Sequence, residues 1–178
     1  QAALWAEAVR ELPAVIRADA AALILNDVAG EPQCVAQVAL SETATTCLTR
    51  LARQLSTDGS FSDVAPYSTS DLHIASRSLD LELKPDCQVH AMVGAPLLRD
   101  HQIHGWLFAV RSAAIPFSPD ALQMALLYAA QTAAALENAR LYRAAHDELT
   151  ERRRVETALR ASDERFRALI RSVSDVIT

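Results

Sequence analysis

The stretch that decides the fold is VHAMVGAPLLRDHQIHGWLFAVRS, residues 89–112. Two apolar runs of strand length stand on either side of the polar segment RDHQ, a pattern that is typical of an antiparallel hairpin. Gly94, Pro96 and Gly105 lie inside the two runs. Such residues within strands indicate a bulge, a sheet edge or a close approach of another segment to the backbone. The chain is therefore expected to contain a β-sheet, of which this hairpin is the clearest part.

The segments before this hairpin predict a helix, a second hairpin and another helix. Apolar residues recur at helical spacing over 2–18, where Pro13 is expected to kink or divide the helix. Two apolar runs within 21–40, separated by a turn-rich segment, predict the second hairpin. Helical spacing returns over 41–55, and Ser41 is a candidate N-cap.

Residues 56–88 are rich in Ser, Asp, Gly and Pro, and we interpret them mainly as loop. One short strand is predicted near Tyr67, and one or two short helical turns are predicted within 72–83, before Pro85. Together with the two hairpins, these elements predict an α/β (α+β) fold. Its centre is expected to be an antiparallel sheet of five to six strands, flanked by helices.

A long helix is predicted to follow the hairpin. In FSPD, residues 117–120, Ser118 can cap the helix and Pro119 suits its first position. The chain contains no Gly and no Pro after Pro119. A helix from 119 to about 161 would be about 65 Å long, whereas a domain of this size is about 30 Å across. Its distal half is therefore expected to project into solvent or to pack on a second chain.

A heptad pattern laid on this helix places apolar residues at most of its a and d positions. Polar residues occupy the other core positions, so the expected coiled coil is an imperfect one. We predict a parallel homodimer through the terminal helices, and the alternative is a single solvated helix. The residues expected to form the dimer and transmission seam are Leu127, Leu141, Ala145, Val155 and Leu159.

Composition and charge exclude some classes of function. The 178 residues carry a net charge of −5, with 8 basic against 13 acidic residues in 1–119. The absence of a basic face and an aromatic content of only 5% argue against nucleic-acid binding. No apolar run reaches the about 20 residues of a membrane span. We expect a cytoplasmic protein without direct membrane contact, and a chain that is a piece of a longer polypeptide.

The three cysteines do not form a recognisable site in the sequence. Cys34, Cys47 and Cys87 are odd in number and widely spaced, and no CxxC motif is present. This pattern argues against a disulfide framework and against a zinc site. We expect buried thiols that act as small apolar side chains.

Residues 92–142, MVGAPLLRDHQIHGWLFAVRSAAIPFSPDALQMALLYAAQTAAALENARLY, resemble the C-terminal half of a GAF domain. The resemblance rests on a strand ending in apolar-Pro-Leu, an apolar strand with an internal Gly, and Phe-Ser-Pro-Asp opening the last helix. In that helix the family pattern is matched by Gln131, Ala133, Ala135, Asn138, Ala139, Leu141 and Tyr142. The resemblance implies a GAF domain over 1–142, although GAF domains serve many outputs.

The residues after this domain resemble two further parts of bacterial signalling proteins. Residues 143–161 look like a signalling-helix linker, and SDERFRAL at 162–169 is similar to the opening helix of a PAS domain. A truncated PAS-like start is thus expected over 162–178. In bacteria, this order usually precedes a histidine kinase of a two-component system, a diguanylate cyclase or a phosphodiesterase.

The GAF resemblance also implies where a ligand would bind, namely between the sheet and the loops that correspond here to about 58–90. Polar and titratable residues of that region are the candidates for contact with a small molecule. The predicted ligand-binding residues are Tyr67, Asp71, His73, Cys87 and His90. The cofactor, if there is one, stays unknown at this point.

Known GAF ligands and activities leave several alternatives. Haem would need an axial histidine, for which His73 or His90 is available. A bilin chromophore usually needs a Cys followed directly by His, whereas Gln88 follows Cys87. The Asn-Lys-Phe-Asp-Glu signature of cyclic-nucleotide-binding GAF domains is absent. His146 resembles a kinase phosphoacceptor only superficially, since the motifs of an ATP-binding domain are missing.

The sequence thus predicts a sensory or regulatory GAF domain, not an enzyme. It is expected to dimerise through its terminal helices and to relay the binding of a ligand or partner to a downstream output domain. Two alternatives stay open. One is a structural dimerisation spacer without a ligand, and the other is a GAF-type cysteine redox enzyme or redox sensor.

Overall fold

The computed structural model describes residues 2–57, 65–78, 87–100 and 102–176. Its centre is a five-stranded sheet in the order β2-β1-β5-β4-β3, and every neighbouring pair is antiparallel. The strands are β1 (Ala20–Asn26), β2 (Pro32–Val38), β3 (Tyr67–Thr69), β4 (Ala91–Arg99) and β5 (Gln102–Arg111). The predicted α/β fold, both hairpins and the short strand at Tyr67 are confirmed.

The glycines of the β4–β5 hairpin let neighbouring groups come close to the backbone. A Cβ on Gly94 would lie 2.5 Å from the Phe108 ring, and one on Gly105 would lie 2.3 Å from the carbonyl oxygen of Ile24. The register between β4 and β5 also shifts at Leu97–Leu98, which is an irregularity of the bulge type. The sequence indicated a bulge, a sheet edge or a close approach at these residues. The structure contains the bulge-type irregularity and the close approach.

One face of the sheet is covered by α2 (Glu42–Thr57) and α3 (Leu72–Ser78). Ser41 caps α2 as predicted, because its Oγ accepts a hydrogen bond from the amide of Ala44 at 3.2 Å. Residues 79–86, which include the rest of the predicted turns and Pro85, lie outside the described part. The large side chains buried on this face are Ile24, Leu48, Leu51, Leu55, Leu72, Met92, Trp106 and Phe108.

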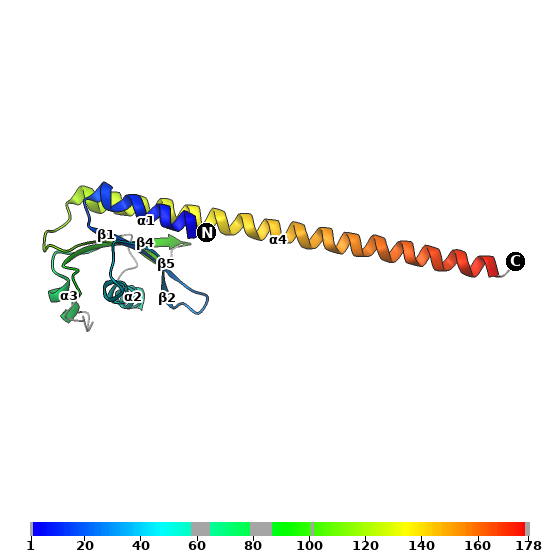
Figure 1. Cartoon of the computed structure of the whole chain (residues 1–178), viewed down its shortest axis with the longest axis horizontal. Helices are drawn as coiled ribbons and strands as arrows, with labels where there is room; N and C mark the ends of the chain where they lie inside the picture. Colours follow the sequence, from blue (N-terminus) through cyan, green and yellow to red (C-terminus); the bar gives the residue numbers. More distant parts are fainter. Residues whose placement is uncertain (1, 58–64, 79–86, 101, 177–178) are drawn as a thin grey trace. The chain divides into compact units, whose positions relative to one another are not determined.

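The opposite face is covered by α1 (Ala2–Ile16) and the first part of α4 (Pro119–Val176). Figure 1 shows α1 and the start of α4 on one side of the strands, with α2 and α3 on the other. Of the two outcomes expected at Pro13, a division of the helix is wrong, since α1 is one element with Pro13 inside it. A kink at Pro13 stays a prediction. Buried Val9, Leu12 and Ile16 hold α1 on the sheet on both sides of the proline.

The last helix begins as predicted but is longer. Ser118 Oγ accepts a hydrogen bond from the amide of Ala121 at 3.3 Å, and Pro119 is the first helical residue. The helix runs to Val176, so the predicted end near 161 is wrong. No residue after Pro119 is a helix breaker, because both Gly and Pro are missing there. Ion pairs at helical spacing support its polar part, as in Glu148–Arg152 at 2.6 Å.

The chain divides into two compact units, residues 1–134 and 135–178, and α4 contributes to both. In the second unit, side chains from 141 to 160 are all exposed. The predicted linker over 143–161 and the PAS-like start over 162–178 stay predictions. Among the described helices, none combines the length and the apolarity that a membrane span requires.

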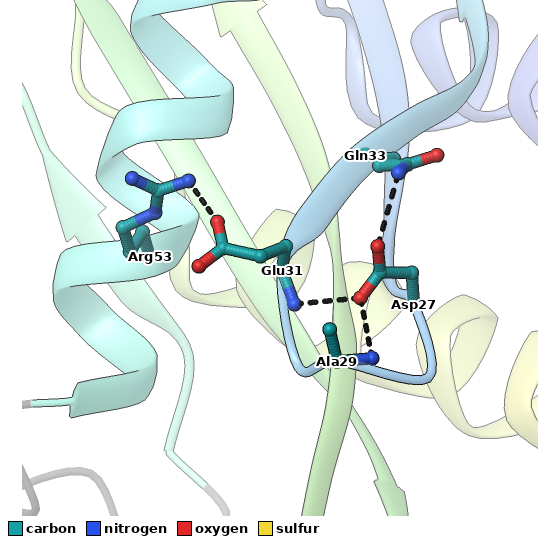
Figure 2. A network of polar contacts seen from close by, with 5 residues as sticks. All are labelled: Asp27, Ala29, Glu31, Gln33 and Arg53. Atoms are coloured by element: carbon teal, nitrogen blue, oxygen red, sulfur yellow. Dashed lines mark hydrogen bonds and ion pairs between the residues drawn. The ribbon is translucent and has the colours of Figure 1, made fainter.

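The carboxylate of Asp27 fixes the shape of the loop between β1 and β2, and the carboxylate of Glu31 links this loop to α2 (Figure 2). Asp27 Oδ1 accepts hydrogen bonds from the amides of Ala29 at 2.8 Å and Glu31 at 2.9 Å, and Oδ2 accepts one from Gln33 at 3.1 Å. Glu31 in turn forms an ion pair with Arg53 of α2. Side-chain bonds of this kind to nearby amides are typical of Asx turns, so Asp27 sets the shape of this loop.

Substitution of Gly105 by Ala should destabilise the domain more than the same substitution at Gly94. The Gly105 Cβ would meet backbone, which cannot move aside, whereas the Gly94 Cβ would meet a ring that can shift. We expect a loss of about 2–4 kcal/mol at Gly105 and about 1–2 kcal/mol at Gly94. Urea unfolding followed by circular dichroism measures both, and equal losses at the two positions would contradict this packing.

Candidate functional site

The predicted ligand-binding residues lie where β3 and α3 meet the start of β4. Tyr67 begins β3 and pairs with Gly94 of β4. Its side chain is half-buried against the core beneath α2, and this burial raises the pKa of the phenol. The loops that were expected to complete the region include residues 58–64 and 79–86, which lie outside the described residues.

Asp71 is used structurally, as the cap of α3. Its Oδ1 accepts hydrogen bonds from the amides of His73 at 2.9 Å and Ile74 at 3.2 Å. The amide of Asp71 itself donates to Thr69 Oγ1 at 3.1 Å. A side chain that holds two amides at a helix start is an N-cap, and this role accounts for Asp71 without a ligand.

His73 and His90 are brought together, as the ligand-site prediction requires. Their ring centroids are 5.2 Å apart with the rings tilted by 50°, and both side chains are half-buried. The backbone places them, because the amide of Leu72 donates to the carbonyl oxygen of His90 at 2.7 Å. The amide of His90 donates to the carbonyl oxygen of Arg111 at 2.9 Å, so His90 continues the β4–β5 pairing.

Cys87 lies three residues before His90 but belongs to the apolar core. It is 3% exposed and clusters with Leu72 and Val89 beneath the sheet face. Cys47 on α2 is 4% exposed in the same cluster, and all three cysteines are free thiols. Cys34 is half-buried, and desolvation raises the pKa of its thiol. The expectation of small buried side chains is therefore confirmed for Cys47 and Cys87, whereas Cys34 is only half-buried.

The sheet face beneath α2 is filled by aromatic side chains of the protein itself. Trp106 and Phe108 are both fully buried and stack with centroids 6.0 Å apart. Trp106 Nε1 donates a hydrogen bond to Ser56 Oγ at 3.1 Å, which satisfies the indole and fixes its orientation. The described residues contain no group of three or more metal-ligating side chains.

Sequence reasoning missed the residue with the most polar contacts, Arg111 at the end of β5. Its guanidinium donates to the carbonyl oxygens of Ile16 at 3.2 Å, Arg17 at 2.8 Å, Ile115 at 3.2 Å and Pro116 at 2.9 Å. It thereby joins the end of α1 to the segment that leads into α4. In the sequence, Arg111 is only the polar end of an apolar run. Its partners are backbone carbonyl groups, two of them four and five residues away and two of them more than 90 residues away.

Two neighbours reinforce this junction. The Arg111 guanidinium lies 4.1 Å from the centre of the Phe117 ring, a cation–π arrangement. Asp19 Oδ2 accepts hydrogen bonds from the amide of Ser112 at 2.8 Å and from its hydroxyl at 2.7 Å. These bonds from Ser112 hold the pKa of Asp19 below its usual range. Hydrogen bonds between side chains and the backbone therefore link the residue before β1, the end of β5 and the end of α1.

The residues predicted for the dimer seam are on the surface of α4. Leu127, Leu141, Val155 and Leu159 are 49%, 51%, 57% and 68% exposed, and Ala145 is exposed as well. Exposed leucines and valines at repeated helical positions are unusual on a solvated helix. Leu149 is also exposed but falls outside the predicted a and d positions.

A five-stranded antiparallel sheet thus lies between two helical layers, and the chain continues into a long C-terminal helix. The GAF domain family matches residues 2–136. The chain therefore belongs to the GAF domain family, as its sequence pattern predicted. No curated protein matches the chain at a significant level.

Solved structures with the same fold come from bacterial proteins. A domain assigned to a two-component sensor histidine kinase of Sinorhizobium meliloti is 21% identical, with a TM-score of 0.64, and 81% of this chain matches 95% of that one. The second GAF domain of DevS from Mycobacterium smegmatis is 20% identical, with a TM-score of 0.57 over 80% and 96% of the chains. The PixJ GAF domain of Thermosynechococcus elongatus is 14% identical, with a TM-score of 0.58 over 84% and 92%.

The thiols should react slowly in the folded protein, since Cys47 and Cys87 are buried and Cys34 is half-buried. We expect the two buried thiols to react with Ellman's reagent at pH 7.5 only as fast as the protein opens, and Cys34 to react at an intermediate rate. All three should react at once in guanidinium. A burst of reaction assigned to Cys87 by mass spectrometry would instead support the redox alternative.

Proposed function

We propose that the chain is a sensory or regulatory GAF domain that relays an event at the α2–α3 face of its sheet to a downstream output domain. The observation that carries this proposal is the position of Arg111. Its side chain binds the end of α1 and the approach to α4, while its carbonyl oxygen binds the amide of His90. One residue thus contacts both the candidate ligand region and the segment that leads into the helix leaving the domain.

The route from α3 to α4 consists of direct contacts. The amide of Leu72 in α3 donates to His90, and the amide of His90 donates to Arg111. The Arg111 side chain then donates to Ile115 and Pro116, just before α4. A shift of α3 on ligand binding would therefore act on the carbonyl groups that position the start of α4. Energetic coupling between two sites requires an element whose conformational equilibrium both sites can change.

We propose further that α4 forms a parallel dimer with a second copy of the chain, together with α1. The exposed apolar residues of α4 are the reason, because a second copy would remove Leu141, Val155 and Leu159 from water. The helix would then serve as the output element. Named GAF domains of sensor kinases among the structural neighbours support a place in a cytoplasmic signalling protein of this kind.

A structural dimerisation spacer is the second candidate function, and one observation favours it. Trp106 and Phe108 fill the sheet face on which GAF ligands are expected to bind. An absorption spectrum and native mass spectrometry separate the two candidates. A chromophore band or an extra mass lost on denaturation supports a sensor, whereas the bare dimer mass supports a spacer. The buried cysteines make the redox enzyme the weakest of the three readings.

The dimer seam can be tested with charges placed on and off its predicted positions. The substitutions Val155→Glu and Leu159→Glu should each weaken dimerisation by about 100-fold or more, because each dimer would then bury two like charges. Leu149→Glu is the matched control, since Leu149 is equally exposed but outside the seam. Sedimentation equilibrium measures all three variants. If dimerisation persists in both seam variants but is lost in Leu149→Glu, the predicted assignment of seam residues is wrong.

Replacement of Arg111 by Lys should loosen the junction while keeping its charge. An ammonium group has three donors and cannot reproduce the fork that reaches four carbonyl oxygens. We expect amide exchange to become about tenfold faster at Ala18, Ile115 and Leu122, as about 1.4 kcal/mol of local stability is lost. Hydrogen-exchange NMR measures this.

Arg10→Lys, on the exposed side of α1, is the control for Arg111→Lys and should leave these amides unchanged. The amide of Leu107 in the central strand reports global unfolding. Faster exchange at Leu107 to the same extent would show a general loss of stability, and unchanged exchange at Ala18 and Leu122 would show that Arg111 does not hold the junction.

A further inference from the structure

We propose that α4 carries a second seam for the other copy of the chain, so that the paired helices have two alternative packings. The inference rests on the proposed dimer and adds a conformational change within it. Two residues outside the predicted a and d positions carry it, namely Tyr142 and Leu149, which are 76% and 55% exposed. They are one heptad apart and therefore lie on the same stripe of the helix.

A second heptad assignment takes Tyr142 and Leu149 as a positions. Between 141 and 160, the first seam consists of Leu141, Ala145, Glu148, Arg152, Val155 and Leu159. The second seam consists of Tyr142, Ala145, Leu149, Arg152, Glu156 and Leu159. Every one of these side chains is exposed in the single chain, so both seams are free to pair. Rotation of each helix by about 50°, one seventh of a turn, converts one seam into the other.

The two seams carry the same number of charged residues. Arg152 belongs to both, and it is joined by Glu148 in the first seam and by Glu156 in the second. The Glu148 carboxylate lies 2.6 Å from the Arg152 guanidinium, and the Glu156 carboxylate forms an ion pair with Arg160. Each carboxylate thus has an arginine one turn away on its own helix, which limits the cost of bringing it into a seam.

Charge complementarity between the copies favours the second seam. In a parallel helix pair, a g residue lies beside the e residue five positions later in the other helix. The second seam places Glu148 beside Arg153 of the partner subunit, which is an attractive pair. The first seam places Glu151 beside Glu156 of the partner subunit, which is a repulsive pair.

Burial of polar groups favours the first seam. The first seam takes Leu141 out of water, whereas the second takes the hydroxyl group of Tyr142 out of water at the neighbouring position. Burial of a hydroxyl group without a hydrogen-bond partner is unfavourable. This difference opposes the difference in charge, so the two seams are close in free energy. An element with two packings of similar free energy is one that a distant event can switch.

The first seam is the resting one, and the second is a minor state. Val155 lies beside the second seam, not in it, so Val155→Glu leaves that seam intact. The loss of about 100-fold expected for Val155→Glu therefore requires that the second seam holds about 1% of resting dimers or less. An event that stabilises this minor state would turn both helices, and the output domain would receive a rotation.

The test is disulfide cross-linking of the whole chain, with Leu141→Cys as the reporter of the first seam and Tyr142→Cys as the reporter of the second. Residues at a and d face their counterparts at disulfide distance, and residues at e and g do not. Each reporter is compared with itself in two further backgrounds, and mass spectrometry of the linked peptides separates the reporters from the three native thiols.

Two substitutions should shift the seams in opposite directions. Glu156→Leu removes the carboxylate from the second seam, so Tyr142→Cys should cross-link about tenfold faster or more and Leu141→Cys more slowly. Glu148→Leu does the same for the first seam, so Tyr142→Cys should cross-link about tenfold more slowly. Asp147→Leu is the matched control, since Asp147 is exposed and lies outside both seams, and it should change neither rate.

Sedimentation equilibrium on the same samples separates failure of this inference from failure of the dimer. If the chain is a dimer and both glutamate substitutions act on the two reporters as Asp147→Leu does, the second seam is absent and the dimer stands. If the chain is a monomer, the dimer and the second seam are both wrong. The Arg111 junction has its own test in either case.

Discussion

One guanidinium group holds together the places where the chain enters and leaves its sheet. Four carbonyl oxygens beside the ends of α1 and α4 find their donor in Arg111. Without it, these groups would be left to solvent or unpaired, at a cost of about 1–3 kcal/mol for each one that stays buried. Arg111 can reach these carbonyl oxygens because it lies at the end of β5. The position of that end is determined by the backbone hydrogen bonds of β5 to β1 and β4. Arg111 thus adds hydrogen bonds at the junction to the apolar packing that holds α1 and α4 on the sheet.

The two faces of the sheet differ in the size of the side chains that they carry. The face beneath α2 and α3 carries the bulky residues Trp106 and Phe108 and, at its edge, the histidine pair. The other face carries small side chains such as Ala21, Ala91 and Ala109 against α1 and α4, and α4 in turn presents Ala125 and Ala129. Small residues let helices lie close to a sheet, and α4 can then continue past the domain as one element. The face with bulky residues thus meets α2 and α3, and the face with small residues meets α1 and α4.

Patterns of local origin were predictable from the sequence, and contacts of distant origin were not. Alternation and turn composition indicate both hairpins, and Ser41 and Ser118 cap their helices because capping depends on residues three positions away. The expected division of α1 at Pro13 is wrong because tertiary burial, which the local pattern does not contain, outweighs the loss of one hydrogen bond. The partners of Arg111 are backbone carbonyl groups up to 95 residues away, and no side-chain motif marks them. The histidines were predicted as candidates, but their spacing depends on the α3–β4 contact.

The short outer strand has a consequence for how such a domain behaves at high concentration. β3 pairs with only Met92, Val93 and Gly94 of the nine-residue β4, so the remainder of β4 pairs with β5 on one side and has no neighbouring strand on the other among the described residues. Unpaired strand edges are templates on which another chain can add a strand. Pro96 lies in this remainder, and a proline offers no amide to an added strand. Pro96 therefore disfavours the addition of a further strand along this part of β4.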